Sequence, residues 1–96
     1  MAGYLIANVD VQDPTTFAKY REQVVPLIAL FGGRYLVRGG EVDHREGQPF
    51  KRLVILEFPS LAEAKRFYNS AEYAPVLQLR LGCAKSDVAL VEGYAG

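Results

Sequence analysis

The sequence contains little cysteine or histidine and no excess of charge of either sign. Eleven lysines and arginines balance eleven aspartates and glutamates, so the formal net charge is zero. Nucleic-acid-binding proteins and polybasic membrane anchors usually carry a basic surplus, so this balance argues against both. No apolar run approaches the roughly 20 residues that a transmembrane helix needs. We therefore expect neither nucleic acid nor a membrane among the partners.

The scarcity of thiols and imidazoles limits the chemistry further. The single cysteine, Cys83, excludes an internal disulfide and fits a reducing cytoplasm, where we place the protein. One histidine and one distant cysteine do not make a zinc site, and no calcium-loop spacing is present, so we expect no metal. The first six residues carry no lysine or arginine and pass directly into a strand-like pattern, so they lack the basic n-region of a signal peptide and we expect none.

What is present is a single alternating pattern of strands and helices. The 96 residues are enough for one compact domain and not for two, so we expect one domain over residues 1–96. Alternation of apolar and polar residues predicts strands over residues 4–11, 34–45, 52–58 and 86–94. The pair Gly39-Gly40 interrupts the second of these, which suggests a bulge or a place where a ligand approaches the backbone.

Helix signals separate these strands. Asp13 suits an N-cap and Pro14 the first helical position, and the apolar stripe that follows predicts a helix up to Gly32-Gly33. Pro26 lies inside this stripe and should kink the helix or split it near residues 22–25. Residues 60–63 (SLAE) match a capping box, so a second helix should follow Ser60 and include Leu61, and residues 69–70 break it into two segments.

The order strand-helix-strand-strand-helix-strand is that of the ferredoxin-like α+β fold. Crossover connections are right-handed as a rule, so both helices should cover one face of a four-stranded antiparallel sheet. We expect the first and third strands to lie side by side at the centre of this sheet and to run parallel to each other.

The sheet face without helices should be unusually apolar. Leu5, Ala7 and Val9 belong beneath the helices, together with Val54, Leu56 and Phe58. The open face then receives Tyr4, Ile6, Asn8, Asp10, Leu53, Ile55, Glu57, Val88, Leu90 and Glu92. A large exposed apolar patch usually marks an interface, so we predict a homodimer whose two sheets pack face to face. The alternative is a monomer with scattered surface hydrophobic residues.

Several segments resemble the bacterial family called domain of unknown function 1330. They are residues 34–41 (RYLVRGGE), 52–60 (RLVILEFPS) and 68–73 (YNSAEY), with further matching pairs at 13–14, 20–21 and 32–33 and a closing LVEG at 90–93. The family is similar to the dimeric α+β barrel superfamily, in which two ferredoxin-like subunits join their sheets. That resemblance implies a dimer but no particular reaction, since the superfamily includes cofactor-free monooxygenases, a lactone isomerase, haem-binding enzymes and stress-related proteins.

Glu57 is the first candidate for chemistry, because a carboxylate on an apolar surface that dries on dimerisation can act as an acid or base. The expected parallel pairing brings Asn8 and Asp10 to the same end of the sheet, and the predicted hairpin places Gly39 and Gly40 opposite Glu57, leaving room for a ligand. Arg38 adjoins that gap and would hold a carboxylate or enolate. The alternative is a structural salt bridge between Glu57 and Arg38 or another cation.

Other polar candidates are less specific. On the same hairpin register, His44 should lie near Leu53, too far from Glu57 of its own subunit for a hydrogen bond. A contact between His44 and Glu57 across a dimer stays open. The alternative is that His44 is a partly exposed strand residue without a chemical role. Tyr20 and Tyr68 are candidates for lining a cavity between helices and sheet. Cys83 follows a glycine near a helix end and is interpreted as a small packed side chain.

Three functions remain open on the sequence alone. The first is a small enzyme without a tightly held cofactor that acts on a small organic acid or carbonyl compound, with Glu57 moving a proton, Arg38 holding negative charge and Asn8 orienting the substrate. The second is a non-catalytic ligand-binding or stress-response module that uses the same cavity. The third is a structural or partner-binding homodimer without a small-molecule site.

Overall fold

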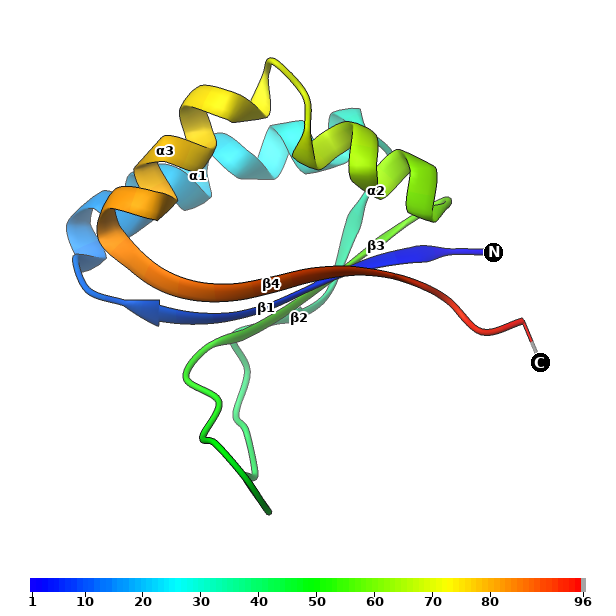
Figure 1. Cartoon of the computed structure of the whole chain (residues 1–96). Helices are drawn as coiled ribbons and strands as arrows, with labels where there is room; N and C mark the ends of the chain where they lie inside the picture. Colours follow the sequence, from blue (N-terminus) through cyan, green and yellow to red (C-terminus); the bar gives the residue numbers. More distant parts are fainter. Residues whose placement is uncertain (96) are drawn as a thin grey trace.

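The computed structural model describes residues 1–95, with three helices and four strands laid out in two layers (Figure 1). In chain order the elements are β1 (Gly3–Val11), α1 (Pro14–Leu30), β2 (Arg34–Arg38), β3 (Leu53–Phe58), α2 (Leu61–Tyr68), α3 (Tyr73–Cys83) and β4 (Ala84–Glu92). All helices lie on one face of the sheet, as the ferredoxin-like fold requires. Within residues 1–95, no helix is both long and apolar enough to cross a bilayer.

The strand order is β2-β3-β1-β4, and every neighbouring pair is antiparallel. The expectation that the first and third strands are adjacent is confirmed, but the expectation that they run parallel is wrong. The reason is topological. Helix α1 carries the chain back so that β2 runs parallel to β1, and β3 then returns from β2 into the gap between them. A strand inserted in this way is antiparallel to both of its neighbours.

Helix α1 begins as the sequence predicts. The Asp13 carboxylate accepts hydrogen bonds from the backbone N–H groups of Thr15 and Thr16 at 3.1 and 3.3 Å, and Pro14 occupies the first turn. The helix runs without a break through Pro26 to Leu30, so the proline does not split it. Gly32 follows in the left-handed region with φ of +78° and ends the helix, as glycine can do without steric cost.

Strand β2 is much shorter than the expected 34–45. It ends at Arg38, because Gly39 turns the backbone into the left-handed region with φ of +68°. Residues 39–52 form a long connection that projects from the sheet on the side opposite the helices (Figure 1). Gly47, with φ of +80°, makes the expected turn near its tip.

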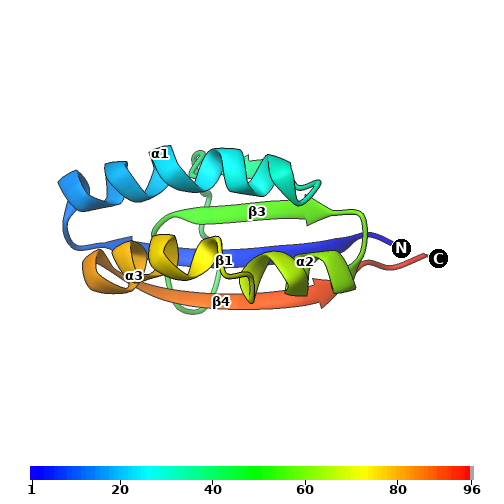
Figure 2. The same ribbon diagram turned by 90° about the horizontal axis from the view of Figure 1, so that it is seen from above.

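The second helical region is divided as predicted. The Ser60 hydroxyl accepts the Glu63 N–H at 3.1 Å, which is the first half of the expected capping box. The Glu63 carboxylate instead binds the Arg66 guanidinium at 2.9 Å, so it does not close the box in the expected way. The break between α2 and α3 lets both helices lie over β1 and β4, while α1 covers the β3 side (Figure 2).

The faces of β4 are the reverse of the prediction. Val88 and Leu90 pair with Ala7 and Leu5, so they point towards the helices and pack against the core. The open face receives Ala89 and Val91 instead, and Glu92 pairs with Gly3 on the helix side. Apolar residues occur on both faces of this strand, so its periodicity alone cannot decide which face is buried.

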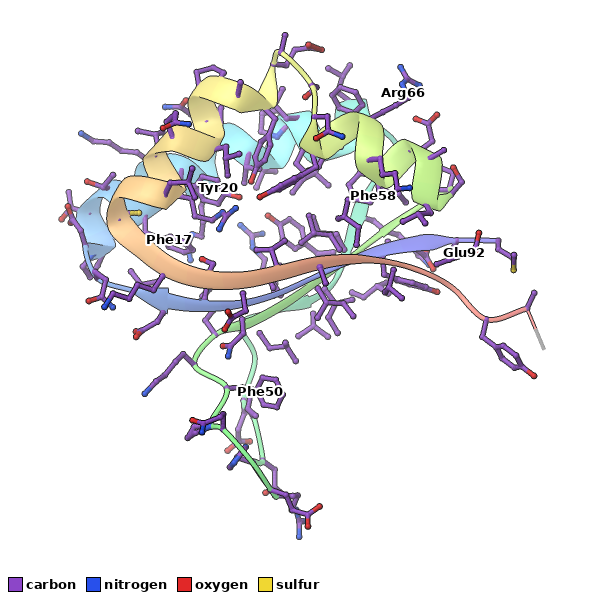
Figure 3. The ribbon with its side chains drawn as sticks, in the orientation of Figure 1. Phe17, Tyr20, Phe50, Phe58, Arg66 and Glu92 are labelled. Carbon is purple, nitrogen blue, oxygen red and sulfur yellow. The ribbon has the colours of Figure 1, made fainter. Side chains whose placement is uncertain are left out.

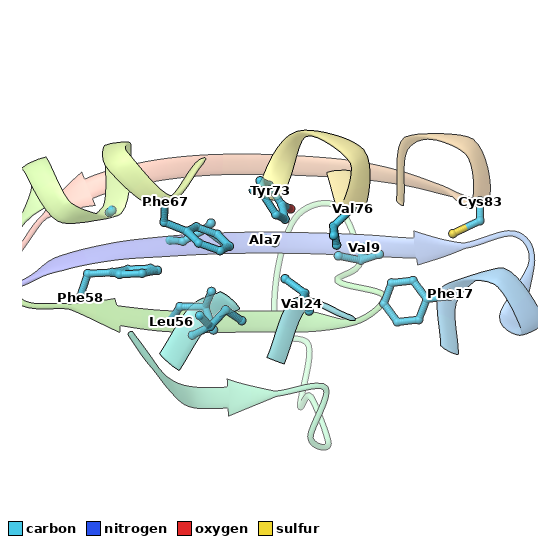
Figure 4. Packing of buried hydrophobic residues seen from close by; sticks show 13 residues of the cluster. Ala7, Val9, Phe17, Val24, Leu56, Phe58, Phe67, Tyr73, Val76 and Cys83 are labelled. Atoms are coloured by element: carbon cyan, nitrogen blue, oxygen red, sulfur yellow. The ribbon is translucent and has the colours of Figure 1, made fainter. Parts of the chain in front are cut away.

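The core lies between the helices and the sheet (Figure 4). All six residues expected beneath the helices are there: Leu5, Ala7, Val9, Leu56 and Phe58 are buried, and Val54 packs against them. Aromatic rings of α2 and α3 stack above them, with ring-centroid distances of 5.3 Å for Phe58–Phe67 and 4.5 Å for Phe67–Tyr73. Cys83 is buried in the same core, as expected of a small packed side chain, and burial raises the pKa of its thiol.

Candidate functional site

A cavity of about 50 Å³ lies between the helical layer and the sheet. Its apolar wall comes from β1, β3 and β4 and from α1, including Leu5, Ala7, Val9, Val24, Val54 and Leu56. Its polar lining belongs entirely to arginine and tyrosine: Arg21, Arg38, Arg52, Arg80, Tyr20, Tyr35 and Tyr73. Figure 3 shows Phe17 and Tyr20 turned into the space between α1 and the sheet.

Three of the arginines converge on one side of the cavity from separate elements. Arg21 comes from α1, Arg38 from the end of β2, and Arg52 from the residue before β3. Within residues 1–95, none of the three has a carboxylate oxygen within 4.0 Å. Burial lowers the pKa of Arg52, and the charges of Arg21 and Arg38 lower it further. The three groups therefore repel one another and create a positive potential that an anion would relieve.

Two of these guanidinium groups are oriented by aromatic rings rather than by carboxylates. Arg38 lies over the Tyr35 ring at 4.6 Å from its centroid, and Arg52 lies over the Phe17 ring at 5.6 Å. Each contact is a cation–π interaction, which orients the cation without neutralising it. The Arg52 Nε is buried and has no hydrogen-bond partner among residues 1–95, so one strong donor of this arginine is left for a ligand.

Gly39 makes room for Arg52. A Cβ atom at this position would lie 2.6 Å from the Arg52 Cζ, which is closer than real Cβ contacts allow. The left-handed backbone at Gly39 is also costly for other residues. Gly39 was predicted to leave space for a ligand; in the structure its missing side chain leaves space for a ligand-facing arginine.

A second polar group lies at the junction of α1 and α3. The hydroxyls of Tyr20 and Tyr73 are hydrogen-bonded at 2.8 Å. Arg80, 5% exposed, donates to the Tyr68 hydroxyl at 3.3 Å and lies 6.0 Å from the Tyr20 ring centroid. Burial raises the pKa of Tyr20 above its usual value, so this hydroxyl keeps its proton at neutral pH. Tyr20 lines the cavity, whereas Tyr68, the other tyrosine expected there, is not part of the lining and supports Arg80.

Glu57 lies outside this cavity, on the open face of the sheet. Its carboxylate is paired with Arg34 at 2.7 Å and accepts a hydrogen bond from the Tyr4 hydroxyl at 3.3 Å. The salt bridge that the sequence left as an alternative is therefore present, with Arg34 as the cation in place of Arg38. Arg38 pairs with Val54 and faces the helices, so the structure does not bring Glu57 and Arg38 together within one subunit.

The remaining members of the expected Glu57 cluster are at the other end of the sheet. Asn8 pairs with Leu53, while Glu57 pairs with Tyr4, four residues or about 13 Å away along the strand. Asp10 lies further in the same direction. Gly39 donates its N–H to the Leu53 carbonyl at 2.8 Å, so the glycine pair 39–40 is not opposite Glu57. Both errors follow from the antiparallel β1–β3 pairing and from the early end of β2.

Asn8 and His44 have contacts of their own. The Asn8 side-chain oxygen accepts the Lys51 N–H at 2.8 Å and ties the long connection to β1. His44 is exposed on that connection, within 2.8 Å of the Gly47 carbonyl through Nε2 and 6.1 Å from the Phe50 ring centroid. The expectation that His44 is a strand residue is wrong, because β2 ends six residues before it.

Sequence reasoning missed five polar cavity residues, Arg21, Tyr35, Arg52, Tyr73 and Arg80, although signals for two of them, Arg52 and Arg80, were present. Arg52 shares the strand parity of Val54, Leu56 and Phe58, which all face the core. Arg80 stands on the same helical stripe as Val76 and Leu77. A charged residue on a buried face generally needs a partner or a function. Arg21 and Tyr73 become cavity residues only through the packing of α1 against α3.

Comparison with known proteins identifies a family and a fold. The family model described as Domain of unknown function (DUF1330) matches residues 2–94. None of the curated protein sequences matches the chain significantly.

Solved structures share the fold at low identity. A protein of unknown function from Rhodopseudomonas palustris superposes with a TM-score of 0.72 at 15% identity, over 99% of this chain and 84% of that one. A dimeric ferredoxin-like protein of unknown function from Jannaschia sp. gives 0.66 at 9% identity, over 97% and 100%. SnoaB, a cofactor-independent oxygenase from Streptomyces nogalater, gives 0.63 at 11% identity, over 99% and 95%. The ferredoxin-like fold is thereby confirmed.

Proposed function

Since this chain belongs to the family described as Domain of unknown function (DUF1330), we propose a function from its cavity: the protein binds a small, partly apolar organic acid between helices and sheet. The observation that carries this proposal is the group of three guanidinium groups, Arg21, Arg38 and Arg52, around an apolar cavity without a carboxylate partner. Arginine binds carboxylates through paired, charge-assisted hydrogen bonds. The apolar wall would hold the rest of the ligand.

The size of the cavity limits the ligand to a small molecule. About 50 Å³ accommodates a ligand of a few heavy atoms beyond its carboxylate. Arg21 and Arg38 are exposed, whereas Arg52 is half-buried. This gradient favours a ligand that enters past Arg21 and Arg38 and is bound by Arg52 inside.

The test is a thermal-shift and calorimetric screen of small organic acids against the wild type and Arg52→Gln. Charge-assisted hydrogen bonds contribute about 1.5–3 kcal/mol each, so the variant should bind a hit at least about tenfold more weakly. Arg45→Gln is the matched control, because Arg45 is an exposed arginine of the long connection, paired with Asp43. Equal affinity for the wild type and Arg52→Gln would contradict the proposal.

Catalysis without a cofactor is the further proposal for this site, and its support is that SnoaB, with the same fold, is an oxygenase of that kind. Mass spectrometry of each binding acid, incubated in air with catalytic amounts of protein, separates the two functions. A product that accumulates beyond one equivalent supports an enzyme. Saturable stabilisation without any product supports the ligand-binding module instead.

The role assigned to Glu57 in proton transfer stays a prediction. Its carboxylate is on the open face and pairs with Arg34, so it would act at a site that a second subunit completes. If a reaction is found, Glu57→Gln should slow it and leave acid binding in the arginine cavity unchanged. Unchanged turnover in this variant would exclude the role.

We also propose that the open face forms a homodimer. Apolar side chains of all four strands cover it, including Val37, Ile6, Ile55, Ala89 and Val91, and the exposed fractions of Ile6 and Val91 are 37% and 43%. Burying such side chains contributes about 25 cal/mol per Å². The dimeric ferredoxin-like protein from Jannaschia shows that this fold can pair.

Light scattering after gel filtration tests the dimer. The wild type should have twice the chain mass of 10.6 kDa. Ile6→Lys and Ala89→Lys should shift it to the monomer, because each places a charge in the middle of the buried face. Leu30→Lys is the control, since Leu30 is an exposed hydrophobic residue at the end of α1. A monomeric wild type at micromolar concentration would refute the dimer.

A further inference from the structure

The inner end of the cavity has a surplus of hydrogen-bond donors. In the Tyr20–Tyr73 pair one hydroxyl donates to the other across 2.8 Å, which leaves the second hydroxyl hydrogen without an acceptor among the residues that line the cavity. Arg80, whose guanidinium can only donate, lies beside the pair. No carboxylate or amide side chain belongs to the lining described in residues 1–95, so a ligand that brings an acceptor would satisfy this hydrogen.

The two ends of the cavity differ in charge. Arg21, Arg38 and Arg52 present three cations at the outer side, which suits the carboxylate of the proposed acid. The inner end presents the two tyrosine hydroxyls and a single further cation, the buried Arg80, which donates to Tyr68. Apolar side chains make up the rest of the lining. A ligand that fits both ends therefore has a charged group, an apolar stretch and a second acceptor.

The cost of desolvation decides the nature of that second acceptor. A second carboxylate would have to lose its water shell at the buried end, which is far more costly than the burial of a neutral group, and would find one partly engaged guanidinium. A carbonyl oxygen loses much less on burial. It can accept the unclaimed hydroxyl hydrogen of the tyrosine pair and adds no donor of its own.

We propose that the ligand is an oxo acid, whose carbonyl oxygen accepts a hydrogen bond from the Tyr20–Tyr73 pair while its carboxylate binds the three arginines. This inference rests on the proposed function, because it names the class of acid that the same cavity binds. Binding of the ligand makes and breaks no covalent bond.

The experiment compares matched acids by calorimetry on the full chain. The acids are pentanoate, 4-oxopentanoate and glutarate, and their six-carbon counterparts hexanoate, 5-oxohexanoate and adipate. Two lengths are used because the span between the arginines and the hydroxyls determines which carbonyl reaches. At one length or both, the oxo acid should bind about tenfold more tightly than the unsubstituted acid.

Tyr20→Phe and Tyr73→Phe locate the effect. Each keeps the aromatic ring and removes one hydroxyl, so the affinity ratio of oxo acid to unsubstituted acid should fall close to one in the variant that loses the donating hydroxyl, while the unsubstituted acid binds as before. Tyr94→Phe is the control, since Tyr94 is 97% exposed. A ratio is insensitive to a general loss of stability, so it separates a binding role of the hydroxyls from a purely structural one.

Each contrary result has a distinct meaning. If the unsubstituted acids bind in an Arg52-dependent way and no oxo acid binds more tightly, the inference is wrong and the proposed function stands. Tightest binding of glutarate or adipate also overturns it, as does a ratio that both phenylalanine variants leave unchanged. If none of the six acids binds, the proposed function fails and the inference fails with it.

Discussion

At the scale of single residues, the cavity depends on arginine side chains that aromatic rings orient and on a glycine that leaves space for one of them. Arg52 lies between the Phe17 ring and the backbone of Gly39. A carboxylate in either place would fix the guanidinium more strongly, but would also neutralise it. Aromatic and glycine neighbours leave the charge available for a ligand.

Replacement of Gly39 by alanine should therefore affect both stability and binding. The left-handed backbone costs a non-glycine residue about 1–2 kcal/mol, and the new methyl group displaces the Arg52 guanidinium. We expect Gly39→Ala to lower the free energy of unfolding in urea and to weaken binding of an acid ligand.

Two other glycines separate these effects. Gly47 has a φ of +80° and open space around its Cβ position, so Gly47→Ala should show the backbone cost alone and leave ligand affinity unchanged. Gly40 also has open space around its Cβ position, and its φ is not in the left-handed region. Gly40→Ala should therefore change neither the free energy of unfolding nor the ligand affinity. Equal ligand affinity in Gly39→Ala and Gly47→Ala would contradict the link between Gly39 and Arg52.

At the scale of elements, helix ends were predictable because their signals are local. The Asp13 cap and the Ser60 cap each depend on residues within three positions in the sequence. The faces of β4 and the direction of β3 relative to β1 were not predictable in this way. Val88 and Ala89 are both apolar, so only the pairing with β1 decides which of them is buried.

The Asp13 cap predicts a pH dependence for the start of α1. Hydrogen bonds from the Thr16 hydroxyl and backbone hold the pKa of Asp13 below its ordinary value of 3.8. A carboxyl whose pKa is lower in the folded state stabilises that state above the unfolded pKa, and the contribution is lost as the pH falls through the folded pKa.

Asp13→Asn should therefore lower the free energy of unfolding at pH 6, and should lower it much less at pH 2. The reason is that the amide accepts the backbone hydrogen bonds but does not titrate. Urea unfolding at several pH values measures the difference between the wild type and the variant. Asp43→Asn, on the long connection, serves as the control. A difference for Asp13→Asn that is constant from pH 6 to pH 2 would refute the assignment of this titration.

At the scale of the whole molecule, the fold could be predicted from the sequence but the arginine lining of the cavity could not. The order of elements restricts the topology to few alternatives, whereas Arg21, Arg38, Arg52 and Arg80 are separated by up to 59 positions in the sequence. Their convergence depends on how α1 and α3 pack over the sheet. The Glu57 cluster failed for the related reason that a reversed strand exchanges the two ends of the sheet.

The proposed dimer predicts that thermal stability depends on protein concentration. Association that occurs only in the folded state raises the unfolding temperature by mass action. Calorimetry between about 5 and 500 μM should show a rising midpoint for the wild type and for Leu30→Lys. The midpoint of Ile6→Lys should be lower and independent of concentration. A constant midpoint for the wild type would argue against a dimer in this range.

The position of β4 has a consequence for how the chain acquires its structure during synthesis. This strand, residues 84–92, pairs along its whole length with β1, which begins at residue 3. Until the ribosome has released β4, one edge of β1 has no neighbour and an apolar strand edge stays open to other nascent chains. We therefore expect this fold to form only once β4 has emerged from the ribosome, and slowly, since most of its strand pairing joins residues far apart in the sequence.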